Sequence, residues 1–135
     1  MNILIIDAQG GGIGKQVVTA IKQNIPAAVI TAVGTNTTAT SVMLKAGADY
    51  GATGENAVIV GARKTDIIIG PIGIIVADSM FGEITPAMAS AVGQSDAKRI
   101  LIPVNHCGNI VVGIRNLSIK EMIEEVIIEL HKLER

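Results

Sequence analysis

The sequence is almost without aromatic residues, since its 135 residues include one tyrosine, one phenylalanine and no tryptophan. It also lacks an excess of positive charge: 11 basic and 12 acidic residues give a formal net charge of −1. Proteins that bind nucleic acid combine a basic surface with aromatic side chains that stack on bases. We therefore expect no nucleic-acid partner and a core built from aliphatic side chains.

Long hydrophobic runs and an export signal are also lacking. The longest uncharged apolar stretch covers residues 67–77 and contains Gly70, Pro71 and Gly73, whereas a helix needs roughly 20 apolar residues to cross a bilayer. The N-terminus shows no basic segment followed by an apolar one. The single cysteine, Cys107, has no internal partner for a disulfide. These features predict a cytoplasmic protein without a membrane partner.

The hydrophobic content is high for a chain of this size. Hydrophobic residues make up 49% of the sequence, and the mean hydropathy is +0.51. The length of the chain is that of one domain, so we expect a single domain over residues 1–135. We interpret the surplus hydrophobicity as surface buried between subunits, which predicts a homo-oligomer.

Apolar runs alternate with amphipathic segments along the chain. Strands are predicted over residues 3–6, 28–33, 66–70, 98–104 and 110–114. Helices are predicted over residues 13–23, 55–62, 86–93 and 119–130, and over a segment that starts at Asn36 or Thr37 and ends at 46. The last helix is predicted to start with a capping box formed by Ser118 and Glu121. Residues 48–54 are predicted as a connector, and 71–78 fit either a strand or the first turn of a buried helix. The alternation predicts an α/β fold, a three-layer Rossmann-like sandwich with a mostly parallel sheet of about five strands. Only five residues link the predicted strands 98–104 and 110–114, too few for a helical crossover, so antiparallel pairing at an edge is open to the last strand.

A glycine-rich loop follows the first predicted strand and leads into the first helix. This arrangement points free backbone N–H groups and the positive end of a helix at an anion. We therefore predict a small phosphate-bearing ligand over the loop, with NAD(P) or another nucleotide as the suspected cofactor. The predicted binding residues, of which Asp7, Thr35 and Asn36 would meet a sugar, are Asp7, Gln9, Gly10, Gly11, Gly12, Ile13, Gly14, Lys15, Thr35 and Asn36.

The loop agrees only in part with the dinucleotide-binding pattern Gly-x-Gly-x-x-Gly/Ala. Gly10 and Gly12 fit the first two glycines, but Lys15 stands at the third position. An acidic residue that holds a ribose hydroxyl is expected after the second strand. Gly-Thr-Asn stands there instead, at residues 34–36.

Residues 11–15 also resemble the Gly-Gly-x-Gly-Lys core of the variant phosphate loop in cell-division and chromosome-partitioning ATPases. Gly10 replaces the signature lysine of that loop, and Gln16 replaces the Ser or Thr that would hold Mg²⁺. A P-loop-like NTPase is thus one alternative. An oligomeric interaction module, in which the loop is only a structural turn, is another.

Further polar residues follow the later strands. The candidates for catalysis are His106, Cys107 and Asp78, but adjacency in sequence does not pair a thiol with an imidazole. Asp78, Ser79 and Glu83 are also candidates for substrate contacts, although we favour a purely packing role for this segment. The other ligands of a zinc site are lacking, so no metal site is predicted.

Three segments resemble a family of short bacterial proteins that is classed as a domain of unknown function. They read Asp-Ala-Gln-Gly-Gly-Gly-Ile-Gly at 7–14, Gly-Glu-Ile-Thr-Pro-Ala-Met-Ala at 82–89 and Ile-Pro-Val-Asn at 102–105. The resemblance spans nearly the whole chain and implies a Rossmann-like fold in a cytosolic protein. It implies no activity and no catalytic residue. The first half is more loosely similar to NAD(P)-binding domains.

Overall fold

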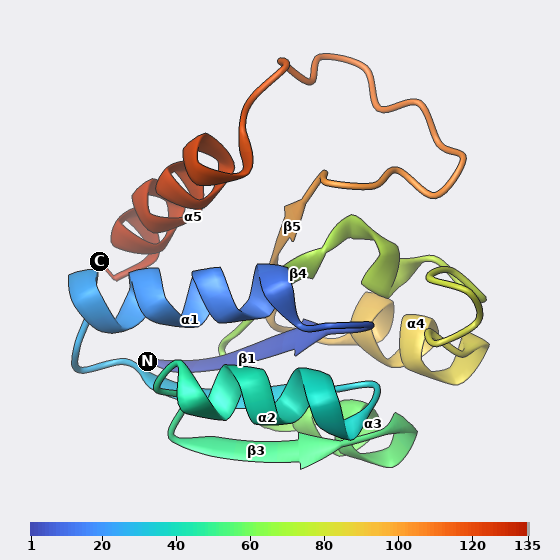
Figure 1. The fold of residues 1–135 in the computed structure, drawn as a ribbon, viewed down its shortest axis with the longest axis horizontal. Helices are drawn as coiled ribbons and strands as arrows, with labels where there is room; N and C mark the ends of the chain where they lie inside the picture. Colours follow the sequence, from blue (N-terminus) through green and yellow to red (C-terminus); the bar gives the residue numbers. More distant parts are fainter. Residues whose placement is uncertain (135) are drawn as a thin grey trace.

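Five parallel strands form the central sheet in the computed structural model, which describes residues 1–134 (Figure 1). The order across the sheet is β3-β2-β1-β4-β5, and all four pairings are parallel. This order matches the first five positions of the classic doubly wound order 3-2-1-4-5-6 of dinucleotide-binding folds. The structure therefore confirms the predicted fold class. The strands are β1 (Asn2–Asp7), β2 (Val29–Gly34), β3 (Tyr50–Thr53), β4 (Ile67–Pro71) and β5 (Lys98–Ile102).

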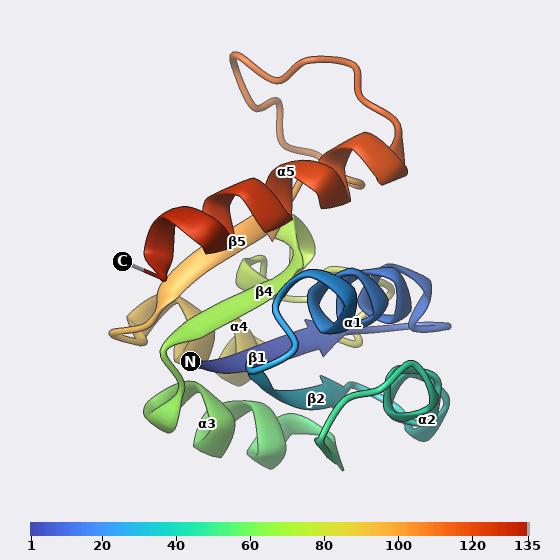
Figure 2. The ribbon, with the colours of Figure 1, turned by 90° about the vertical axis from the view of Figure 1, so that its left-hand side faces the viewer.

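Helices cover both faces of this sheet (Figure 2). Ile3 and Ile5 of β1 face a core shared with α1 (Gly12–Asn24), α2 (Thr37–Lys45) and α5 (Ile119–Leu133). Leu4 and Ile6 face the opposite core, shared with α3 (Glu55–Lys64), the short 3₁₀ helix η1 (Ile72–Ile75) and α4 (Pro86–Gln94). Successive side chains of a strand point to opposite faces, so an uninterrupted apolar strand is the pattern of a sheet covered on both sides.

The structure corrects two parts of the predicted sheet. Residues 48–54, predicted as a connector, contain the edge strand β3, whose Tyr-Gly-Ala-Thr sequence carries little apolar signal because all four residues are exposed. Residues 110–114, predicted as a strand, form none and pair neither parallel nor antiparallel. They lie in the segment 103–118, which extends away from the sheet (Figure 1), so the apolar run has no neighbouring strand to bond. The ambiguous segment 71–78 begins with η1.

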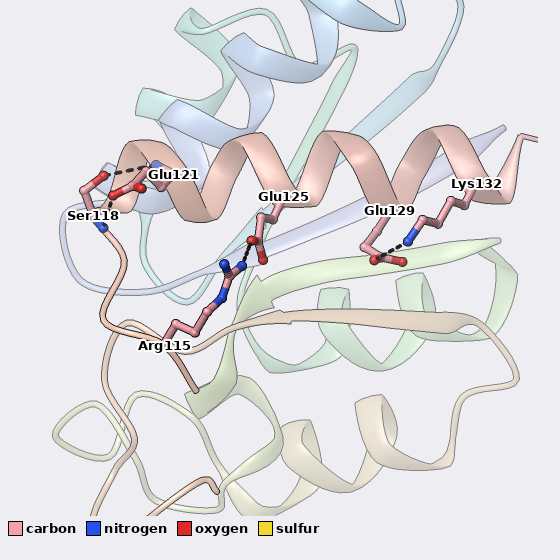
Figure 3. A network of polar contacts seen from close by, with 6 residues as sticks. All are labelled: Arg115, Ser118, Glu121, Glu125, Glu129 and Lys132. Carbon is pink, nitrogen blue, oxygen red and sulfur yellow. Dashed lines mark hydrogen bonds and ion pairs between the residues drawn. The ribbon is translucent and has the colours of Figure 1, made fainter. Parts of the chain in front are cut away.

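The last helix is fixed at its start by its own cap and by an ion pair (Figure 3). The Ser118 hydroxyl accepts a bond from the Glu121 amide, and the Glu121 carboxylate accepts one from the Ser118 amide. Arg115 pairs with Glu125, which ties the end of the segment 103–118 to α5. The predicted capping box is confirmed. No helix within residues 1–134 combines the length and apolar character needed to span a bilayer.

Candidate functional site

The carboxyl ends of β1 and β4 define the place where this fold receives ligands. From β1 the chain proceeds outward through β2 to β3, whereas β4 and β5 lie on the other side of β1. The connections after β1 and β4 therefore leave toward opposite faces of the sheet, and ligands of open α/β sheets bind at such a point. The loop 8–11 after β1 and the start of α1 lie at this edge.

Two glycines of this loop are required by internal packing. A Cβ built on Gly11 would lie 2.8 Å from the Cα of Ala39 in α2, and Gly11 also adopts a left-handed φ of 73°. A Cβ on Gly14 would lie 2.4 Å from the Sδ of Met43 and 3.1 Å from the Cβ of Asp7. Both positions let α1 and α2 approach each other closely, so these glycines have a structural explanation without any ligand.

The other two glycines of the loop have no such explanation. A Cβ on Gly10 or Gly12 would have no atom of residues 1–134 within 4 Å. Neither has a left-handed φ, and both are exposed. A bare backbone at these two positions leaves room for a ligand to approach the amides at the start of α1.

Asp7, predicted to meet a sugar, is turned inward instead. Its Oδ1 accepts a bond from the Ala8 amide at 2.8 Å and its Oδ2 one from the Gly14 amide at 2.7 Å. Burial raises the pKa of Asp7 above its ordinary value, an effect that bonds from Gly14, Ala8 and Ile13 only partly offset and that the negative charge of Glu83 strengthens. The carboxylate thus caps the first turn of α1, which leaves the Gly12 amide as the one in that turn without a partner in residues 1–134.

The carboxylate of Glu83 lies beside Thr35 and Asn36, where the sugar of a bound nucleotide was predicted. Its Oε1 accepts a bond from the Gln9 amide at 2.8 Å, from the Thr35 hydroxyl at 2.6 Å and from the Asn36 side-chain amide at 3.0 Å. The loop after β1 and the end of β2 therefore direct three donors at one carboxylate oxygen. The sequence offered Glu83 only as one of three polar side chains in its segment, because its donors lie 47 to 74 residues away in the chain.

The ionised form of Glu83 is favoured in the folded protein. Partial burial alone would raise the pKa of this carboxyl group, but hydrogen bonds from Thr35, Gln9 and Asn36 outweigh burial and lower its pKa below the ordinary value. Each bond to a carboxylate is stronger than one between neutral groups. Thr35 and Asn36, which were predicted to contact a ligand directly, contact this carboxylate in the structure.

A tightly turned segment, residues 76–84, brings Glu83 to this position. The buried Ser79 hydroxyl donates to the Gly73 carbonyl at 2.6 Å, and the amide of the exposed Asp78 donates to the Ile84 carbonyl at 2.7 Å. Asp78 thus contributes a backbone hydrogen bond to this turn, and no hydrogen bond within residues 1–134 joins it to the glycine loop. The segment contains four residues with left-handed backbone, namely Asp78, Met80, Phe81 and Gly82.

Lys15 is the only other charged side chain among the predicted loop residues. It is exposed in the first turn of α1 and is free to reach an anion over the loop. Ile13 is half-buried, and its backbone amide, predicted to contact the ligand, bonds Asp7 instead. Gln9 has a left-handed φ of 52°, which directs its amide at Glu83 and its carbonyl at the Asn36 side chain.

His106 and Cys107 are not paired with each other. Nε2 of His106 is 3.1 Å from the Pro103 carbonyl oxygen, and Sγ of Cys107 is 3.6 Å from the Asn105 carbonyl oxygen. Cys107 does lie at the carboxyl edge of the sheet, since a Cβ on Gly73 would be 3.2 Å from its Sγ. The hydrogen bonds provide no nucleophile–base pair here. Within residues 1–134 no three His, Cys, Asp or Glu side chains are grouped as metal ligands.

The fold and the loop define a Rossmann-like α/β domain of small size. The family model described as "Domain of unknown function (DUF3842)" matches residues 2–135, and the chain belongs to this family. The predicted resemblance to a family of unknown function is thereby confirmed. No curated protein matches the sequence.

The chain was also compared with solved structures, and one of the matches is a dodecameric FMN-dependent Ubix-like decarboxylase from Escherichia coli O157:H7. The two structures have a TM-score of 0.49 and 18% sequence identity. The similarity covers 99% of this chain and 76% of the decarboxylase chain.

Proposed function

We propose that this protein binds a nucleotide or dinucleotide at the carboxyl edge of its sheet, with a phosphate over Gly10 and Gly12. The observation that carries the proposal is the division of the loop glycines: packing requires Gly11 and Gly14, whereas Gly10 and Gly12 face open space. The Gly12 amide at the start of α1 and the Lys15 ammonium are the groups that would hold the phosphate. The strand order and the β1/β4 divergence support the same place.

The electrostatics of this edge restrict how a ligand would lie. Asp7 already caps α1, and Glu83 adds a second carboxylate over the end of β2. A phosphate is repelled by both, so we place it at the outer side of the loop, beside Gly12 and Lys15. The hydroxyl-bearing part of the ligand would then lie toward Glu83, because a carboxylate accepts hydrogen bonds and donates none when ionised.

A thermal-shift screen tests this proposal. We expect NAD⁺, or one of the nucleoside diphosphates ADP, GDP, CDP and UDP, to raise the melting temperature of the wild-type protein without Mg²⁺. A ligand at 100 times its Kd stabilises the folded state by about 2.7 kcal/mol. The Lys15→Ala variant should bind the same ligand more weakly. If none of these compounds changes the melting temperature, nucleotide binding is refuted.

The P-loop-like NTPase remains an alternative with its own outcome. Gly11, Gly12 and Gly14 precede Lys15 as in the variant phosphate loop, but Gln16 provides no hydroxyl for Mg²⁺. Under this alternative, ATP stabilises the protein only when Mg²⁺ is present, and Lys15→Ala abolishes the effect. Stabilisation that is independent of Mg²⁺ favours the first proposal.

We also propose that the protein forms a homo-oligomer through the segment 103–118. Two of its aliphatic side chains, Ile110 and Val112, are 94% and 93% exposed, and such side chains close together are typical of a covered surface. The double variant Ile110→Asp/Val112→Asp should be a monomer in light scattering after size exclusion, and the wild type an oligomer. A monomeric wild type, or an unchanged oligomer in the variant, contradicts this proposal.

A further inference from the structure

Glu83 occupies the position of a residue that the second strand lacks. In dinucleotide-binding folds an acidic residue after that strand holds a ribose hydroxyl, whereas this chain has Gly-Thr-Asn at residues 34–36. Thr35 and Asn36 instead bond the carboxylate of Glu83, which arrives from the connection between β4 and α4. An acidic group is thus present at the end of β2, although a distant part of the chain provides it.

The two oxygens of this carboxylate are in different situations. Oε1 receives all three bonds, from Gln9, Thr35 and Asn36, and no donor of residues 1–134 bonds Oε2. Glu83 as a whole is only partly buried, and Oε2 is the acceptor that we assign to a ligand. An ionised carboxylate has several acceptor positions, and two adjacent hydroxyl groups supply two donors.

The fold holds Glu83 here against a conformational cost. Asp78, Met80 and Phe81 have φ values of 64°, 55° and 57°, a region that side chains other than glycine rarely adopt. The bond from Ser79 to the Gly73 carbonyl holds the turn at the end of β4. Strained residues that position one side chain this way are often found at functional sites.

We infer that Glu83 accepts hydrogen bonds from the two hydroxyl groups of a vicinal diol. The ligand is then a nucleotide whose ribose has both hydroxyl groups free of phosphate. This inference rests on the proposed nucleotide binding at the glycine loop. A 2′-deoxy ligand loses a bond to a charged acceptor, and a 2′-phosphate adds a like charge beside Glu83. The site therefore selects ribonucleotides and rejects 2′-phosphorylated cofactors.

Calorimetric titrations of ligand pairs test this selectivity. The pairs are NAD⁺ with NADP⁺, and each of ADP, GDP, CDP and UDP with its 2′-deoxy counterpart. For the wild type we expect at least about tenfold weaker binding of the deoxy or 2′-phosphorylated member, as loss of a charged hydrogen bond implies. In Glu83→Gln, which keeps an oxygen acceptor for the three donors, the ratio within each pair should fall toward one. Glu124→Gln, the same change of charge on the exposed face of α5, should retain the wild-type ratio.

The outcomes separate this inference from the proposed function. If wild type binds a ribonucleotide and its deoxy counterpart equally, the diol inference is wrong while nucleotide binding stands. If Glu83→Gln binds both members more tightly than wild type, Glu83 occupies the place of a ligand anion, which also overturns the inference. If no nucleotide binds the wild type, the proposed function fails first. The ligand comparison in the wild type needs no variant and is decisive even if Glu83→Gln does not fold.

Discussion

Gly11→Ala is expected to lower the free energy of unfolding by about 3 kcal/mol, which combines the cost of a left-handed backbone with that of overpacking. The added Cβ would lie 2.8 Å from the Cα and 3.0 Å from the carbonyl oxygen of Ala39. Both are backbone atoms, so relief requires α2 to move away from the loop. Urea unfolding followed by circular dichroism measures the change.

Gly12→Ala is the matched control within the same loop. Its Cβ meets no atom of residues 1–134 within 4 Å, and Gly12 is the first residue of α1. Alanine is a better helix former than glycine by about 1 kcal/mol, so this variant should be as stable as wild type or slightly more stable. It should nevertheless bind nucleotide more weakly, because the methyl group fills part of the proposed phosphate site. Equal losses of stability in Gly11→Ala and Gly12→Ala would contradict the division of the loop.

Asp7→Ala is expected to destabilise the fold by about 3 kcal/mol, the effect of leaving buried amides of a helix start without an acceptor. The carboxylate bonds the amides of Ala8 and Gly14 and is 5% exposed, so water does not readily replace it. Asp7→Asn, which keeps one acceptor oxygen, should lose less. Denaturant unfolding at constant pH measures both variants, and a stable Asp7→Ala would show that Asp7 does not cap α1.

The raised pKa of Asp7 fixes the direction in which this residue makes the free energy of unfolding depend on pH. Its pKa in the folded protein is raised above the ordinary 3.8, chiefly by burial, so the folded state holds this proton more tightly than the unfolded state. Relative to Asp7→Asn, wild type is therefore most stable below pH 3.8 and loses that advantage as the pH rises through the folded pKa. An advantage that instead grows over this range would mean that the pKa is lowered.

Most of the fold is predictable from the sequence because its strands and helices carry strong apolar patterns. Ile3 to Ile6 lie in the two cores of the sheet, the stripe of α5 packs on one of them, and the cap at Ser118 is a local signal that the structure confirms. β3 carries no such pattern: it is defined by backbone pairing with β2 and is bonded by Thr40 of α2, and neither can be read from its own four residues. The segment 110–114 shows the opposite failure: a good strand pattern without a partner strand.

The candidate site is predictable only where it is local. The glycine loop stands out in the sequence, but the division between Gly11 and Gly12 depends on where α2 lies, which no spacing within the loop reveals. Asp7 turns inward because the Gly14 amide is within reach, a matter of tertiary geometry. Glu83 reaches Thr35 across 48 residues, and only the assembled sheet edge brings the two together.

Backbone amide chemical-shift mapping by NMR tests the central claim most directly. Wild-type protein would be titrated with the nucleotide that stabilises it in the thermal screen. We predict that the largest shifts occur at the amides of Gln9, Gly10, Gly11 and Gly12, with smaller ones at Thr35 and Glu83. Shifts confined to another surface, such as the 600 Å³ groove between α1 and α5 that Thr19 and Ile127 help to line, would contradict a phosphate site at the glycine loop.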